Sequence, residues 1–401
     1  MNDSHSSEDL GATPLRFLCV CLPYAGHIYP TLGTVAALVD AGHDVRCVLD
    51  PRWRREVEAT GARFIPYDRY PSDPGPVSRS LLAPRRAFAT AQRVAAQERY
   101  DCLLYEALFS YGKALAVSLG LPAVRLSSTF AYTRQILENL ARTGGRHLTS
   151  VMRDGPLYRM LSAQAHRKGF LQSADFITEI VDNPPDLTYV YTSRSFQIDA
   201  EEFPEERFRF IGPSLEARSS DPTRRPDLDA ESPLIYVSMG TLLNRRPRFY
   251  RACIAAFADA PVSVVMSIGH GLDPARLGEL PHNITVHPWV PQLDVLRHAD
   301  LFITHGGMNS VNESIYAEVP MLVVPQGNDQ PTVADRVEEL GLGMRLDPAE
   351  ATPARLQSAS ERVLGSQSVS AHVAAISADM RAAGGNARAV EEITRMLTRR
   401  R

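Results

Sequence analysis

Residues 289–330 read WVPQLDVLRHADLFITHGGMNSVNESIYAEVPMLVVPQGNDQ and contain two short apolar runs, each followed by a polar loop. The runs DLFIT and PMLVVP are rich in branched side chains and flanked by turn-forming residues, which is typical of buried parallel strands. The intervening NSVNESIYAE has helical spacing. The order strand, helix, strand predicts a parallel sheet, with polar groups gathered at the carboxyl ends of its strands.

The same alternation of strands and helices extends over most of the chain. Residues 16–23, 43–50, 101–106 and 123–128 are further strand-like runs before the centre, and 234–240, 262–269 and 283–290 follow it. A loop, YAGHIYP, is expected after the first strand. The polar, proline-containing stretch 214–233 lacks an apolar period and is typical of a linker. The sequence therefore predicts an α/β protein of two doubly wound halves, 14–213 and 234–385.

Composition limits the class of protein. The 401 residues are 44% hydrophobic and 22% charged, with a formal net charge of −3, which is typical of a globular protein of about two domains. This charge provides no positive field for nucleic acid. No apolar run is long enough to span a bilayer, and the polar N-terminus does not resemble a secretory signal. The five cysteines lack metal-ligand spacing, so we expect reduced core thiols and a cytoplasmic location.

A candidate anion site follows the strand that ends at His305. Gly307 allows a ligand to approach the backbone, and the next helix presents unpaired N–H groups at its start. Asn309 and Ser310 lie in that first turn, and Glu313 lies one turn further on. Such a turn, taken alone, is equally typical of an ordinary capped helix with a structural histidine.

Neighbouring strand ends favour a ligand. Trp289 and Gln292 follow one strand, and an indole is a good platform for a nucleobase. Asp329 and Gln330 follow another strand and could contact sugar hydroxyls. Successive strand ends thus offer an aromatic face, an anion site and a polar pair, which is the order of base, diphosphate and hexose in a nucleotide sugar.

The quoted stretch resembles the donor-binding box of family 1 glycosyltransferases with the GT-B fold, shared by plant secondary-product and bacterial macrolide transferases. The resemblance implies two Rossmann-like domains facing across a cleft, with a C-terminal helix, 386–401, returning to the first domain. It also implies a role in donor binding for Trp289, Val290, Gln292, His305, Gly307, Asn309, Ser310, Glu313, Asp329 and Gln330.

A further loop at the start of the second half resembles the family's phosphate-side loop. It contains Ser238, Gly240 and Thr241 and follows the strand LIYVS. An ordinary strand-to-helix turn is the alternative for this loop.

The first half contains the candidate base. Attack by a neutral hydroxyl needs a general base, and histidine titrates in the right range. Gly26-His27-x-x-Pro30 resembles the family's first-loop motif, whose histidine is that base. Its partner in the family is usually an aspartate at the end of a strand, but here that position holds Glu106. Glu106 is expected to orient His27; a surface carboxylate, with His27 acting alone, is the alternative.

The acceptor is expected to bind against the first half. Phe109, Phe130 and Tyr132 are candidate wall residues, and core packing is the alternative for each. The motif Asp227-Leu228-Asp229 spells a metal-binding D-x-D but lies in the linker, so no metal site is expected. We also expect no bound cofactor, because the nucleotide sugar is a co-substrate. A monomer and a homodimer both stay open.

These observations predict an inverting hexosyltransferase that acts on a lipophilic natural product such as a macrolide. UDP-glucose is the favoured donor and a TDP-sugar the second choice. Alternatives are a nucleotide-sugar epimerase or hydrolase of the same fold, a non-catalytic sugar-nucleotide-binding partner of another transferase, and a transferase acting on a lipid-linked cell-wall acceptor.

Overall fold

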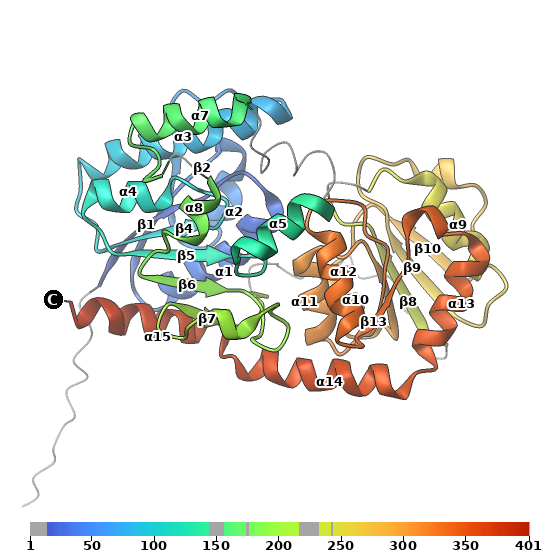
Figure 1. Cartoon of the computed structure of the whole chain (residues 1–401). Coiled ribbons are helices and arrows are strands. Elements are labelled where there is room, and N and C mark those ends of the chain that lie inside the picture. Colours follow the sequence, from blue (N-terminus) through green and yellow to red (C-terminus); the bar gives the residue numbers. More distant parts are fainter. Residues whose placement is uncertain (1–13, 144–155, 174–175, 216–231, 242–243, 401) are drawn as a thin grey trace, which may run out of the picture.

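The structure, a computed structural model, describes residues 14–143, 156–173, 176–215, 232–241 and 244–400, which form two α/β halves (Figure 1). The N-terminal half has a seven-stranded sheet of order β3-β2-β1-β4-β5-β6-β7, and the C-terminal half a six-stranded sheet of order β10-β9-β8-β11-β12-β13. Neighbouring strands pair in parallel in both sheets. The predicted doubly wound α/β fold is confirmed.

In the N-terminal half, strands alternate with helices, as its apolar runs predict. Its described elements are β1 (Arg16–Val20), α1 (Ala25–Asp40), β2 (Asp44–Leu49), η1 (Pro51–Trp53), α2 (Arg54–Glu58), β3 (Arg63–Pro66), α3 (Pro76–Ala95), β4 (Cys102–Glu106), α4 (Gly112–Leu119), β5 (Ala123–Ser127), α5 (Arg134–Thr143), α7 (Pro156–Arg167), α8 (Phe176–Val181), β6 (Leu187–Val190), η2 (Ala200–Glu202) and β7 (Phe208–Phe210).

The C-terminal half has the same alternation of strands and helices. Its described elements are β8 (Leu234–Ser238), α9 (Pro247–Phe257), β9 (Ser263–Ser267), η4 (Pro274–Leu277), β10 (Ile284–His287), α10 (Gln292–Leu296), β11 (Leu301–Thr304), α11 (Met308–Tyr316), β12 (Met321–Val323), α12 (Gln330–Glu339), β13 (Gly343–Arg345), η5 (Pro348–Glu350), α13 (Pro353–Leu364), α14 (Gln367–Ala382) and α15 (Gly385–Thr398).

The start of α1 corrects one expectation. The segment YAGHIYP was expected to be a loop, but the helix begins at Ala25, with the extended Tyr24 as its N-cap. Pro30 lies inside α1, and proline is tolerated in the early turns of a helix, although it removes one backbone hydrogen bond. His27 is therefore held on a helix rather than a loop, which fixes its direction relative to the sheet.

Strand order places one topological switch point in each half. In the first sheet β1 pairs with both β2 and β4, and in the second β8 pairs with both β9 and β11. Chain connections leave in opposite directions on either side of such a point, which opens a crevice at the carboxyl ends of the strands. Both switch points adjoin segments singled out in the sequence.

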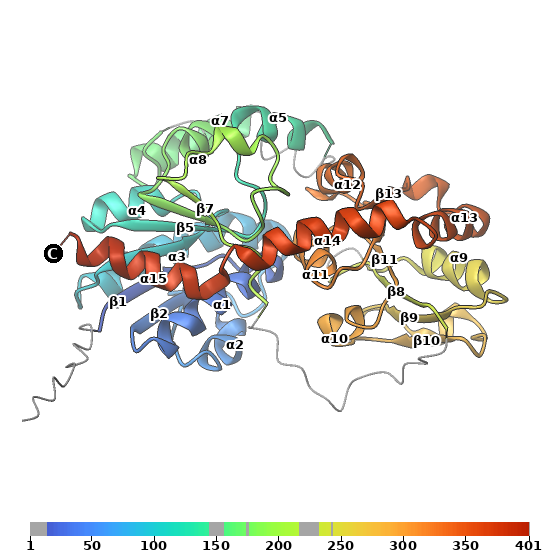
Figure 2. The ribbon, with the colours of Figure 1, turned by 90° about the horizontal axis from the view of Figure 1, so that it is seen from below.

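The two halves contact each other through buried side chains, and the C-terminal helices cross from the second half to the first. Phe130 and Phe196 of the N-terminal half stack with ring centroids 5.6 Å apart and belong to a buried cluster built mainly from the C-terminal half. The Arg336 guanidinium donates to the carbonyls of Ser195, Phe196 and Gln197. Figure 2 shows α14 running along both halves, after which α15 lies against the N-terminal half, where it packs on α1.

None of the helices in these ranges is long and apolar enough to cross a membrane.

Candidate active site

The first switch point brings His27 and Glu106 together. His27 lies in the first turn of α1, directly after β1, and Glu106 is the last residue of β4. Because β1 and β4 pair in parallel, their carboxyl ends meet. His27 Nδ1 lies 3.1 Å from Glu106 Oε2, and the glutamate side chain is completely buried. Its Oε2 also accepts a hydrogen bond from the Leu108 amide at 3.0 Å, which fixes the carboxylate.

A third group, Ser128, was missed in the sequence. Its Oγ lies 2.8 Å from His27 Nδ1, at the end of β5. The sequence shows only that Ser128 stands at the end of a strand-like run; the pairing of β5 with β4, which brings it to His27, comes from the structure. With Nδ1 facing Glu106 and Ser128, Nε2 is the nitrogen left to meet a ligand.

Charges on both sides of the cleft act on His27. Burial lowers the pKa of its imidazole. The hydrogen bond and charge of Glu106, with a smaller contribution from Asp329, raise the pKa by more than burial lowers it, so the pKa of His27 lies above its ordinary value. Burial raises the pKa of the Asp329 carboxyl, and the charge of His27 partly offsets this rise. His27 belongs to the N-terminal half and Asp329 to the C-terminal half, so the cleft brings these two groups within electrostatic reach.

The second switch point encloses the imidazole of His305. A Cβ placed on Gly240 would lie 2.4 Å from His305 Nε2, and one on Gly307 would lie 2.5 Å from it. Only glycine therefore fits at either position without displacing the ring. Gly240 also has φ +69, in the left-handed region that favours glycine.

The neighbouring β8 loop is the one singled out in the sequence. Ser238 is buried and its Oγ accepts from the Gly240 amide at 3.4 Å, whereas Thr241 is exposed.

His305 is held neutral. Burial lowers the pKa of its imidazole to about 4, and a hydrogen bond with the Ser238 backbone offsets this only in part. At neutral pH the ring can donate one hydrogen bond but carries no positive charge. α11 begins beside it at Met308, with Gly307 as an N-cap that makes no side-chain cap hydrogen bond. The first amides of this helix are thus available to an anion.

Side chains near the start of α11 are pre-ordered. Gln292 Nε2 donates to Glu313 Oε2 at 2.6 Å and to Ser310 Oγ at 3.2 Å. Trp289 is 41% exposed, an unusual degree for a large aromatic side chain, whereas Val290 is buried in the core. The exposed indole of Trp289 thus precedes, by three residues in the chain, an amide that is ordered by a carboxylate.

Asn309 makes a contact between the halves. Its Nδ2 donates to the Gly26 carbonyl at 2.8 Å. That carbonyl is the one a regular helix would pair with the amide of residue 30, and Pro30 has no N–H to give. The proline thus frees an acceptor that Asn309 uses. Asn309 was expected beside a phosphate; in this structure it bridges to α1 next to the candidate base.

The loop after β12 is ordered by Gln330. Its Oε1 accepts from the Gln326 amide at 2.7 Å and the Gly327 amide at 3.2 Å. Asn328 has φ +59, which asparagine tolerates better than most residues. These features place Asp329 at the start of α12. The side-chain oxygen of Gln330 is used within the loop, whereas no described residue accepts from its amide nitrogen.

Two of the three candidate acceptor residues are core residues. Phe109 has no exposed surface and packs edge-on against Tyr105, and Phe130 is 1% exposed. Neither offers surface to an acceptor here, which corrects that expectation in favour of core packing. Tyr132 is only partly buried, and its hydroxyl forms a hydrogen bond with Thr129. Burial raises the pKa of Tyr132, and the charge of Asp329 adds to this rise.

In the described ranges, no group of three histidine, cysteine, aspartate or glutamate side chains could hold a metal ion. The Asp227-Leu228-Asp229 motif and most of the expected linker lie outside the described residues. All five cysteines are buried and free.

Comparisons with known proteins agree with this arrangement. Residues 226–379 match the family model of UDP-glucuronosyl and UDP-glucosyl transferases. The NDP-glycosyltransferase YjiC of Bacillus licheniformis is 34% identical over 94% of this chain and 96% of its own. The oleandomycin glycosyltransferase of Streptomyces antibioticus is 30% identical over 95% of this chain and 90% of its own.

A solved structure has the same architecture. That of CalG4, the calicheamicin glycosyltransferase, superposes with a TM-score of 0.83 and 31% identity, covering 96% of this chain and 99% of that one. The protein belongs to the family 1 glycosyltransferases with the GT-B fold, of the bacterial natural-product type. It is accordingly a hexosyltransferase.

Proposed function

We propose that the protein transfers a hexose from a nucleoside diphosphate sugar to a hydroxyl of a lipophilic natural product, such as a macrolide or another polyketide, with inversion at the anomeric carbon. One observation carries this proposal: His27 Nδ1 lies 3.1 Å from the buried Glu106, and the charge of Asp329 from the opposite half also raises the pKa of His27. A base and a candidate sugar-binding carboxylate on opposite walls of the cleft suit direct displacement.

In the proposed reaction, His27 Nε2 removes the proton of the acceptor hydroxyl as its oxygen attacks the anomeric carbon. The bond from that carbon to the diphosphate oxygen breaks, and its electron pair leaves with the diphosphate. Glu106 stabilises the imidazolium that forms and holds the ring orientation, as a carboxylate does for a histidine base in other enzymes.

On the donor side, Trp289 would stack on the base, and Val290 would support it from the core. Gln292 and Glu313, already joined at 2.6 Å, would contact the ribose. The charge of the leaving diphosphate would be stabilised by preorganised N–H groups of α11 and by the neutral His305. The remaining proposed diphosphate contacts come from Ser238, Gly240, Thr241, Gly307, Asn309 and Ser310.

Asp329 and the amide nitrogen of Gln330 suit a hydroxyl-rich hexose, so we favour UDP-glucose over a TDP-deoxysugar. The free cysteines support a reducing compartment, which we infer to be the cytoplasm.

A donor panel tests the proposal. UDP-glucose and TDP-glucose would each be incubated with one macrolide and one flavonoid acceptor, and products read by mass. We expect the acceptor to gain one hexosyl unit, more rapidly from UDP-glucose. Reactions without acceptor serve as the control: rapid release of free hexose, or a new nucleotide sugar, without any acceptor product would favour the hydrolase or epimerase alternative instead.

A further inference from the structure

A cavity of about 390 Å³ opens at the start of α9, and three arginines line it. Arg245, Arg246 and Arg248 lie within four consecutive residues, and Gln326 completes the polar lining from the loop after β12. Among the described residues none forms an ion pair or a side-chain hydrogen bond with these guanidiniums. We call these four residues and the cavity between them the arginine groove.

Acidic residues near the groove are engaged elsewhere. Glu350 Oε2 pairs with Arg355 at 3.2 Å, and Asp347 Oδ1 accepts from the Ala349 amide at 2.8 Å. The three arginines that line the cavity carry like charges that repel each other, and that repulsion is relieved when an anion enters. The groove therefore has the charge and volume of a binding site for an oxyanion larger than a single carboxylate.

The groove adjoins both loops proposed to hold the donor. Gly240, which packs against His305, is held by Asn244, whose Nδ2 donates to the Gly240 carbonyl at 2.8 Å. Arg245 follows Asn244 directly in the chain. On the other side, Gln326 belongs to the same ordered turn as Asp329, because Gln330 holds its amide at 2.7 Å.

Positive charge is otherwise missing from the proposed diphosphate contacts. These are backbone amides, hydroxyls, the Asn309 amide and His305, which burial keeps neutral at neutral pH. A diphosphate leaving group gains negative charge as the glycosidic bond breaks, and guanidiniums are well suited to phosphate oxygens. In the described part of the chain after β8, the arginines of the groove are the first cations in the sequence, and no described residue forms an ion pair with them.

We propose that the arginine groove is an oxyanion subsite that binds the diphosphate of the donor and of the nucleoside diphosphate product. This inference rests on the proposed function, since it assumes that the ligand is a nucleoside diphosphate. The groove supplies the counter-charge that the neutral His305 site lacks.

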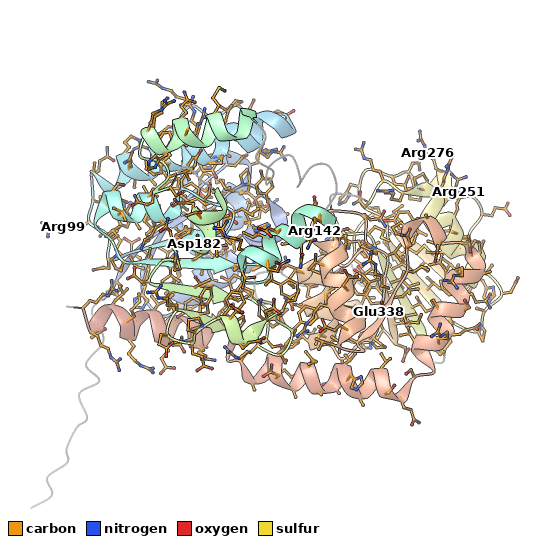
Figure 3. All side chains as sticks on the ribbon, viewed as in Figure 1. Arg99, Arg142, Asp182, Arg251, Arg276 and Glu338 are labelled. Atoms are coloured by element: carbon orange, nitrogen blue, oxygen red, sulfur yellow. The ribbon has the colours of Figure 1, made fainter. Side chains whose placement is uncertain are left out.

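The test is calorimetric binding of UDP and of uridine to the full chain, over a series of salt concentrations. The triple variant Arg245→Gln, Arg246→Gln, Arg248→Gln removes the groove charge, and a matching triple lysine variant retains it. Arg276→Gln is the control for loss of a surface arginine outside the groove, because Arg276 is exposed in η4 and does not line the groove (Figure 3). Thermal melting confirms that each variant is folded.

We expect the glutamine variant to weaken UDP binding by about 10- to 100-fold at low salt, with a flatter salt dependence and unchanged uridine binding. The lysine variant should retain most of the affinity, and Arg276→Gln should bind UDP as the wild type does. Unchanged UDP binding by the glutamine variant, equal weakening of uridine, or an equal effect of Arg276→Gln would each overturn the proposal.

Two further outcomes distinguish the diphosphate proposal from a carboxylate-binding site and from a failure of the proposed function. UDP-glucuronic acid is titrated in parallel: if its binding weakens in the glutamine variant while UDP binding does not, the groove binds a sugar carboxylate and the diphosphate assignment is wrong. If the wild type binds UDP but transfers no hexose to any acceptor, the proposed function fails, while the groove is still judged by its effect on UDP binding.

Discussion

His27 Nδ1 lies 3.1 Å from Glu106 Oε2, although His27 lies in the first turn of α1 and Glu106 ends β4, with β2 and β3 between them in the sequence. The glutamate has no exposed surface, and its Oε1 has no hydrogen-bond partner among the described residues. A buried carboxylate is stabilised when a neighbour carries positive charge. Formation of the imidazolium during proton abstraction would supply that charge at the moment it is needed.

Replacing His27 by alanine should reduce turnover by about 10²–10⁴-fold, the usual contribution of a general base. The dissociation constant for UDP should stay unchanged, because the proposed nucleotide contacts lie in the other half. Steady-state kinetics and calorimetry measure the two quantities. His282→Ala, an exposed histidine outside the site, is the control. Near-normal turnover in the His27 variant would remove it from the chemistry.

Replacing Glu106 by glutamine should move the acid limb of the rate profile to lower pH. The base must be neutral to accept a proton, so activity falls as the pH drops through the pKa of His27. Glu106 raises that pKa, by its hydrogen bond and its charge, and its neutralisation should lower it. The profile of kcat/KM against pH measures the shift.

The conservative variant is the control for this shift. Glu106→Asp keeps the charge and should keep substantial activity, with an acid limb closer to that of the wild type. An acid limb that Glu106→Gln leaves in place would show that the carboxylate does not act on His27.

Replacing Trp289 by alanine should weaken UDP binding by about 1–3 kcal/mol, the usual value for stacking of a base on an aromatic side chain. Trp289→Phe should restore part of this loss. Trp53→Phe is the matched control, because the only other tryptophan packs against Tyr29 in the N-terminal half. Equal UDP affinity in Trp289→Ala and wild type would place the base elsewhere.

Hexose transfer should persist in excess EDTA, because the proposed diphosphate contacts are amides, hydroxyls, imidazole and guanidinium groups. Initial rates with and without the chelator measure this. Complete loss of activity that Mg²⁺ or Mn²⁺ restores would instead assign a metal role, for which Asp227-Leu228-Asp229 would be the first candidate.

Much of the fold could be predicted because buried parallel strands are continuous apolar runs. Two edge strands, β3 and β13, were not predicted: RFIP and GMR are short, and their side chains are partly exposed, so neither gives a clear apolar run. The helical start of α1 was obscured by Pro30, which is more often a helix breaker than an interior residue.

For the site, chain order was enough to collect residues that follow strands, since parallel strand ends share one edge. Contacts that depend on how two halves meet were not predictable in this way. The hydrogen bond from Asn309 to Gly26 requires both the interdomain orientation and the carbonyl freed by Pro30. Ser128 required the pairing of β4 with β5, which sequence periodicity does not give.

The stereochemistry of the transfer tests the central claim most directly. Wild-type protein would be incubated with an α-linked UDP-glucose donor and an acceptor that it glycosylates, and the anomeric configuration of the purified product determined by NMR. Direct attack from the face opposite the diphosphate, with His27 as base, predicts a β-linked product. An α-linked product would contradict single displacement and with it the roles assigned to His27 and Glu106.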